Sequence, residues 1–219
     1  RIIPQLGPCR CLECPVCYES IETCFNNSEL ACQTSQIEAA INNILNKFKI
    51  KISAKEALLA EEGQVINGCL VLKEEHYRAE AFKDRTDFSS VLALQLKHVA
   101  YCMFMNAKNL ETVMMPEAVG IVDGGYDQNT FWSTDLQNIY FPKLKKIGAY
   151  AFQQQQQLVN VNHEIFPALE VIGKWAFYYC VQIKSVNLPN LKSVGNDGFT
   201  GCSRLESFSA PALKQVGDG

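Results

Sequence analysis

The chain lacks the features that point to catalysis, to membranes or to nucleic acid. None of its 219 residues lies in an apolar run close to the roughly 18 residues that a membrane-spanning helix needs. Only three histidines occur, none in an HExxH motif, and GxSxG, Walker A and GxGxxG motifs do not occur. The net charge of −3 gives no attraction to nucleic acid or anionic lipid. We therefore expect a folded protein that is not an enzyme, spans no membrane, binds no nucleic acid and needs no metal or cofactor.

Cysteine is plentiful but unevenly placed. Four of the ten cysteines are scattered, and six lie close together near the start of the sequence: Cys9, Cys11, Cys14, Cys17, Cys24 and Cys32. The favoured interpretation is a set of disulfides that stabilise a segment too small for its own core, although the sequence does not choose among the pairings. The alternatives are zinc-binding thiolates, with CxxC units that overlap at Cys14, and a redox-active Cys14–Cys17 pair.

Two further features favour an oxidising compartment. The sequence begins at Arg1 and not at Met, as it would after removal of a leader. Asn26 begins an Asn-Asn-Ser sequon and is a glycosylation candidate. Together with the cysteine cluster, these features predict a secreted or cell-surface protein.

An internal repeat occupies most of the chain. It aligns on a phenylalanine that recurs every 21–27 residues, at Phe82, Phe104, Phe131, Phe152, Phe177 and Phe199. Between these residues, apolar positions, a proline and a glycine recur in fixed columns. The unit is L-x-x-I-x-x-P-x-L-x-x-I-G-x-x-A-F-x-x-C-x-x.

This unit resembles the BspA-type leucine-rich repeat of bacterial and protist surface proteins, over residues 76–219. Such a unit cannot bury its apolar face alone, so stacked units share one core. We expect an α/β fold, a leucine-rich-repeat solenoid of about six repeats with a parallel sheet on one face. In each turn proline ends the strand, the phenylalanine fills the core, and glycine permits a turn with positive φ. The resemblance implies a protein that mediates contact at a surface.

The side chains on either side of each strand's central residue should point outward and form the ligand-binding sheet face. They are polar, short and mostly uncharged. The candidates are Thr112, Asn138, Tyr140, Asn160, Asn162, Ser185, Asn187, Ser207 and Ser209, and Met114 is the partner of Thr112. This face could be a solvated surface or a platform for a protein or glycan partner. Insertions near residues 123–127 and 163–165 should form surface loops.

The segment before the repeats divides in two, a cysteine-rich part at residues 1–33 and a helical capping region at residues 34–75. Residues 34–48 carry a helical apolar stripe, with Ser35 and Glu38 at capping-box spacing. Ser53 and Glu56 repeat this spacing in a second helix that Gly63 would end. Residues 65–72 should form a strand. We expect this small N-terminal cap to shield the first repeat from water.

The sequence thus predicts an interaction protein that mediates adhesion, or protein or glycan binding, through its solenoid. The alternative is a structural subunit that assembles head to tail into a filament or layer, since the last repeat stops before its phenylalanine. Cys180 and Cys202 occupy a core position and should be buried thiols, close enough in neighbouring turns for a bridge if the geometry allows.

Overall fold

A computed structural model describes residues 28–219, with side chains described from residue 33 onward. Cys9, Cys11, Cys14, Cys17, Cys24 and Asn26 therefore lie outside the described residues, and so does the side chain of Cys32. The chain divides into two compact units, residues 1–60 and 61–219, each of which is described by itself. The disulfides, the zinc alternative and the glycosylation site remain predictions.

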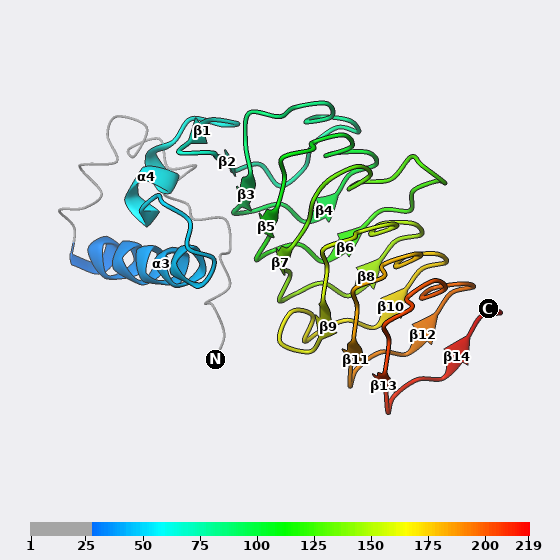
Figure 1. The fold of residues 1–219 in the computed structure, drawn as a ribbon. Helices are drawn as coiled ribbons and strands as arrows, with labels where there is room; N and C mark the ends of the chain where they lie inside the picture. Colours follow the sequence, from blue (N-terminus) through cyan, green and yellow to red (C-terminus); the bar gives the residue numbers. More distant parts are fainter. Residues whose placement is uncertain (1–27) are drawn as a thin grey trace. The chain divides into compact units, whose positions relative to one another are not determined.

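In the described part of the first unit, from residue 28 onward, the chain forms α3 (Ser28–Lys47) and α4 (Ala54–Leu59) (Figure 1). α3 begins seven residues before Ser35, so the expected cap at Ser35 is wrong: this residue lies inside the helix. The buried side chains of Ile41, Ile44 and Leu45 confirm its apolar stripe. The capping box of α4 is confirmed, because Glu56 N–H donates to Ser53 Oγ at 3.1 Å and Ser53 N–H donates to Glu56 Oε2 at 2.7 Å.

Gly63 does not end α4, which stops at Leu59 with Ala60 as its C-cap. Gly63 instead takes φ +70° in the turn that leads to the second unit's first strand. The expected strand over residues 65–72 is a hairpin of β1 (Val65–Ile66) and β2 (Cys69–Leu72). Its two-residue turn consists of Asn67 (φ 48°) and Gly68 (φ 77°), and positive φ at both turn residues is the geometry that Asn-Gly favours.

The second unit is a solenoid, as the repeat predicts, and it has about seven turns where about six repeats were expected. β2, β3 (Ser90–Ala93), β5 (Thr112–Met114) and β7 (Asn138–Tyr140) pair in parallel, and β9 (Asn160–Asn162), β11 (Ser185–Asn187) and β13 (Ser207–Ser209) pair likewise. These seven strands form the front of the solenoid (Figure 1). The central apolar residues of these strands, such as Val113 and Val186, are buried in the core, except Phe208 of the last strand, β13.

A second parallel sheet runs the length of the solenoid, which the sequence analysis did not foresee. Its six short strands are β4 (His98–Val99), β6 (Gly120–Ile121), β8 (Lys146–Ile147), β10 (Val171–Ile172), β12 (Ser193–Val194) and β14 (Gln215–Val216). They contain the second apolar column of the repeat, and Ile121, Ile147 and Ile172 are buried. Each turn from β3 onward therefore contributes two strands, and from β5 onward a proline lies between them.

The repeated phenylalanines form a continuous stack through the core. Successive rings from Phe82 to Phe199 have centroids 5.1–5.8 Å apart and interplanar angles of 1–15°. All but Phe199 are buried. The spacing follows the distance of about 4.8 Å between paired strands, because identical positions in neighbouring turns lie directly above one another. The predicted core role of this column is confirmed.

The recurring glycines are needed for space, and the expectation of positive φ is wrong for them. Gly148, Gly173, Gly195 and Gly217 do not have positive φ. A Cβ on Gly173 would lie 2.6 Å from the backbone nitrogen of Ala149 in the preceding turn, and one on Gly148 would lie 2.2 Å from the carbonyl oxygen of Val122. Neighbouring turns approach so closely here that only glycine fits.

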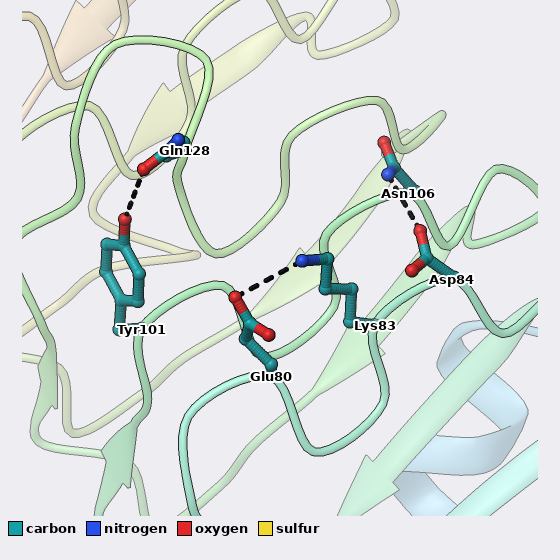
Figure 2. A network of polar contacts seen from close by, with 6 residues as sticks. All are labelled: Glu80, Lys83, Asp84, Tyr101, Asn106 and Gln128. Carbon is teal, nitrogen blue, oxygen red and sulfur yellow. Dashed lines mark hydrogen bonds and ion pairs between the residues drawn. The ribbon is translucent and has the colours of Figure 1, made fainter.

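Positive φ occurs instead two residues before and two residues after most core phenylalanines. The position after the phenylalanine has φ between 55° and 78° in every described turn: Asp84, Asn106, Ser133, Gln154, Tyr179 and Gly201. Side chains join neighbouring turns at this corner, since Asn106 Nδ2 donates to Asp84 Oδ1 at 2.8 Å (Figure 2). These corners reverse the chain within a few residues, which a right-handed conformation alone would not do.

Candidate ligand-binding face

Eight of the nine predicted face residues come together on the front of the solenoid. They form two columns across β9, β11 and β13, with Ser185 level with Asn160 and Ser207, and Asn187 level with Asn162 and Ser209. Asn138 and Tyr140 take the corresponding positions of β7. All eight side chains are exposed or half-buried. We call this set the open polar face: Asn138, Tyr140, Asn160, Asn162, Ser185, Asn187, Ser207 and Ser209.

Thr112 does not belong to this face, which corrects the prediction. It is only 5% exposed, and its hydroxyl accepts a hydrogen bond from Asn138 Nδ2 at 3.3 Å. Its partner Met114 is buried, as are the residues at the outward positions of β2 and β3: Cys69, Val71, Ser90 and Leu92. The signal was present in the sequence, because the outward positions change from mainly apolar to polar between β5 and β7.

The front sheet is interrupted between β7 and β9, inside the open polar face. The strands hydrogen-bond in the orders β1-β2-β3-β5-β7 and β9-β11-β13, with no ladder between β7 and β9. The insertion after β9 explains the interruption. Asn162 O accepts from Phe166 N–H at 2.9 Å, and Asn162 Oδ1 accepts from Glu164 N–H at 3.1 Å. These groups close a local turn, so the carbonyl of Asn162 is not directed at β7.

Part of the open polar face is therefore occupied by structural hydrogen bonds. Asn138 donates to Thr112, and Asn162 closes the turn after β9. Partial burial raises the pKa of the Tyr140 hydroxyl, which keeps this group a neutral donor and acceptor. Asn160, Ser185, Asn187, Ser207 and Ser209 are the positions at which a ligand can form hydrogen bonds without breaking these contacts.

Charged residues border this face, which the sequence analysis missed. A shallow depression of about 400 Å³ is lined by Lys184, Ser203, Arg204, Leu205 and Glu206. Lys184 and Glu206 directly precede β11 and β13, and Arg204 Nη1 donates to Gln182 Oε1 at 2.6 Å. The recurrence of charged residues just before the strand was the available signal. A polar face beside mixed charges can hold a partner by hydrogen bonds and ion pairs.

The buried thiols support the fold. Cys180 Sγ donates to Phe152 O at 3.0 Å and Cys202 Sγ donates to Phe177 O at 3.2 Å, each reaching the preceding turn. Gln155 Nε2 makes the same contact with Phe131 O at 2.8 Å. The predicted burial is confirmed, and both cysteines are free thiols in the structure. Burial raises the pKa of Cys180 and raises the pKa of Cys202 to about 11, so both remain protonated at neutral pH.

Metal sites and membrane-spanning helices are absent from the described part of the chain. Residues 28–219 contain no group of three or more His, Cys, Asp or Glu side chains arranged to hold a metal ion. Neither described helix has the length and apolarity required to cross a membrane.

Comparison with known proteins identifies the repeats. Residues 126–219 match the sequence profile of the family described as BspA type leucine rich repeat region, in six copies. No curated protein matches the chain. A leucine-rich-repeat protein from T. pallidum is similar in structure, with 20% identity, a TM-score of 0.55 and 69% of each chain covered. One from Bacteroides ovatus has 22% identity and a TM-score of 0.52, with 64% of this chain and 36% of that chain covered. These likenesses show the fold.

Proposed function

Because residues 126–219 are BspA-type leucine-rich repeats, we propose that this chain is an interaction protein whose open polar face binds a partner protein. One observation carries the proposal: exposed or half-buried uncharged polar side chains occupy both outward columns of β9, β11 and β13 in register, and the corresponding two positions of β7. Hydrogen-bonding groups at fixed spacing on rigid strands are preorganised, so a partner that matches them loses little entropy in ordering the site.

The proposal includes a location and a mode of action. The resemblance to surface proteins, the cysteine cluster and the sequon support a secreted or cell-surface protein that acts in adhesion. A glycan partner is the second candidate for the same face, because Asn and Ser side chains both donate and accept hydrogen bonds. Catalysis is not part of the proposal, since the open polar face carries no carboxylate, imidazole or thiol.

The test is a matched pair of substitutions in neighbouring strands. Ser185→Arg puts a long cation on the open polar face, and Ser193→Arg puts the same side chain on β12 of the second sheet. Both serines are half-buried at outward positions, so the two variants should have similar stability. We expect proteins that bind the wild type and the Ser193→Arg variant, but not the Ser185→Arg variant. Partners that bind all three proteins equally would refute the proposal. If a purified oligosaccharide competes with the partner for the wild type, the ligand of this face is a glycan.

Head-to-tail assembly is the alternative function. It is supported by β13 and β14, the outer strands of their sheets, on which Phe208 is 43% and Val216 is 67% exposed. Such apolar edges can pair with another chain. Light scattering should then show mass that increases with concentration and decreases in a Phe208→Lys variant. A constant monomeric mass would exclude this alternative.

A further inference from the structure

Five aromatic side chains form a connected cluster at the corner of the solenoid that follows the second sheet. We call it the aromatic ridge: Tyr126, Tyr150, Trp175, Tyr178 and Tyr179. Adjacent rings in this order have centroids 6.5, 4.9, 6.5 and 4.6 Å apart. Its two end residues are exposed, Tyr126 to 62% and Tyr179 to 48%, whereas Trp175 and Tyr178 are half-buried and Tyr150 is buried beneath its neighbours. Exposed aromatic clusters of this kind mark interaction surfaces.

The insertion near residues 123–127 holds Tyr126 in place. Gly124 N–H donates to Ala149 O at 2.7 Å, and Ala149 N–H donates to Asp123 Oδ1 at 2.9 Å. At the other end of the loop, Tyr101 donates its hydroxyl to Gln128 Oε1 at 2.9 Å (Figure 2). The inserted residues thus form an anchored loop that presents an aromatic ring to solvent beside Tyr150. Such preorganisation lowers the cost of binding.

Three of the ridge residues have a left-handed backbone conformation that other residue types adopt at a lower conformational energy. Tyr150, Trp175 and Tyr179 have φ of 59°, 53° and 55°. The equivalent corners of other turns contain residues that adopt this conformation more readily, among them Asp84, Asn106, Asp197 and Gly201. The fold needs the positive φ but not the aromatic rings. Their presence at strained positions is the pattern expected of a functional surface.

A single unpaired cation lies within the ridge. Lys174 Nζ is 5.3 Å from the ring centroid of Trp175 and 5.8 Å from that of Tyr150. The nearby carboxylates have other direct partners: Asp123 pairs with Lys146 and with Ala149 N–H, and Asp197 accepts from Thr200. Asp123 interacts with Lys174 only through a weaker electrostatic attraction. Within residues 61–219, no carboxylate lies within ion-pair distance of Lys174. A partner with a negative charge would therefore complement it.

We propose that the aromatic ridge binds an extended, proline-containing segment of a partner protein, with an acidic residue of that segment paired to Lys174. Adjacent rings are tilted by 47–85°, so they share no plane on which a row of sugar rings could stack. Aromatic side chains are the surfaces on which polyproline II segments dock, and the stiffness of such a segment keeps the entropy cost of binding low. This surface is separate from the open polar face, and the two proposals stand independently.

The test uses synthetic peptides and calorimetric titration of the whole chain. The probes are an oligoproline peptide flanked by glutamates, the same peptide flanked by lysines, and a neutral glucan oligosaccharide. We expect the glutamate peptide to bind about tenfold more tightly than the lysine peptide, and Lys174→Ala to remove the difference. Trp175→Ala and Tyr126→Ser should each weaken the glutamate peptide about tenfold.

Val159→Ser serves as the control, because it removes an exposed apolar side chain elsewhere on the solenoid and should leave peptide binding unchanged. The Tyr126→Ser variant separates loss of binding from loss of folding. Its ring lies on an exposed loop, so its removal should not change the melting temperature. Binding of neither peptide would overturn the proposal. It would also be overturned if the glucan alone bound, or if both ridge variants bound the peptide as the wild type does.

Discussion

At the scale of single residues, two columns determine how closely the turns stack. The phenylalanine column fills the interior, and the glycine column removes every side chain where neighbouring backbones meet. Phe152 lies between Phe131 and Phe177, with ring centroids 5.2 and 5.4 Å away. Gly173 lies against the backbone of Ala149. Each column predicts the effect of its own substitutions.

Phe152→Ala should destabilise the solenoid by about 3–5 kcal/mol, because it leaves a cavity between two stacked rings. Phe199→Ala should cost clearly less, since Phe199 is only partly buried and its ring stacks on one phenylalanine of the column. Urea unfolding of the two variants measures both values. Equal losses of unfolding free energy would contradict the continuous stack.

Gly173→Ala should destabilise the protein by about 1–3 kcal/mol, because the new Cβ forces the two turns apart. Gly125 provides the control: its φ is not positive, and a Cβ there would have no neighbour closer than 3.9 Å. Gly125→Ala should be neutral or stabilising by up to about 1 kcal/mol. The melting temperatures of the two variants test this prediction. Equal changes in melting temperature would show that lack of space is not the reason for glycine at position 173.

The buried thiols predict a dependence on alkaline pH. Burial raises the pKa of Cys202 to about 11, above its ordinary value of 9.0, and raises the pKa of Cys180 as well. The unfolded chain therefore loses these protons first as pH rises, so stability should be complete below pH 9 and fall between about pH 9 and 11. A Cys180→Ala, Cys202→Ala double variant should show a shallower fall in urea midpoint over this range. An unchanged slope would contradict the assignment.

At the scale of elements, the sequence predicts the repeated front strands correctly. It is less accurate for the elements that occur only once. Phe131 and Ile139 identify their turn because the same spacing recurs in its neighbours. The hairpin at Asn67–Gly68 has no repeat to reveal it, although Asn-Gly is a strong hairpin signal. The start of α3 at Ser28 was missed because Ser35 and Glu38 have capping-box spacing although both lie inside the helix. A capping pattern is therefore a local signal that an existing helix can override.

The candidate site shows the same limit. Strand spacing correctly placed Asn160 and Asn187 at outward positions, because side chains alternate along a strand. The burial of Thr112 could not follow from alternation, which gives direction but not exposure. The interruption between β7 and β9 depends on how Asn162 uses its carbonyl group, which is a property of the loop and not of the repeat.

One ion-paired cluster joins three consecutive turns at the junction of the two sheets. The Glu117 side chain is 5% exposed and lies 3.3 Å from Lys97 Nζ and 2.6 Å from Lys143 Nζ. Glu117→Ala should cost about 1–3 kcal/mol, since it leaves two cations close together without their shared partner. Glu170→Ala, which removes the exposed Lys192–Glu170 pair, should have little effect. Equal urea midpoints for the two variants would contradict this role for Glu117.

At the scale of the whole molecule, one set of residues stabilises the solenoid and another set forms its proposed binding surfaces. Each turn contacts mainly its neighbours, so the buried columns set stability while outward positions are free to vary. The open polar face and the aromatic ridge both occupy such outward positions in the second unit. In the proposed function, these outward side chains and not the repeat motif determine the partner.

The affinity of a purified partner for the Ser185→Arg variant tests the central claim most directly. With Ser193→Arg as the matched control, we predict that only Ser185→Arg weakens binding, by about tenfold or more, with both melting temperatures close to that of the wild type. A partner that binds Ser185→Arg as tightly as it binds the wild type would contradict the claim that the open polar face is the binding site.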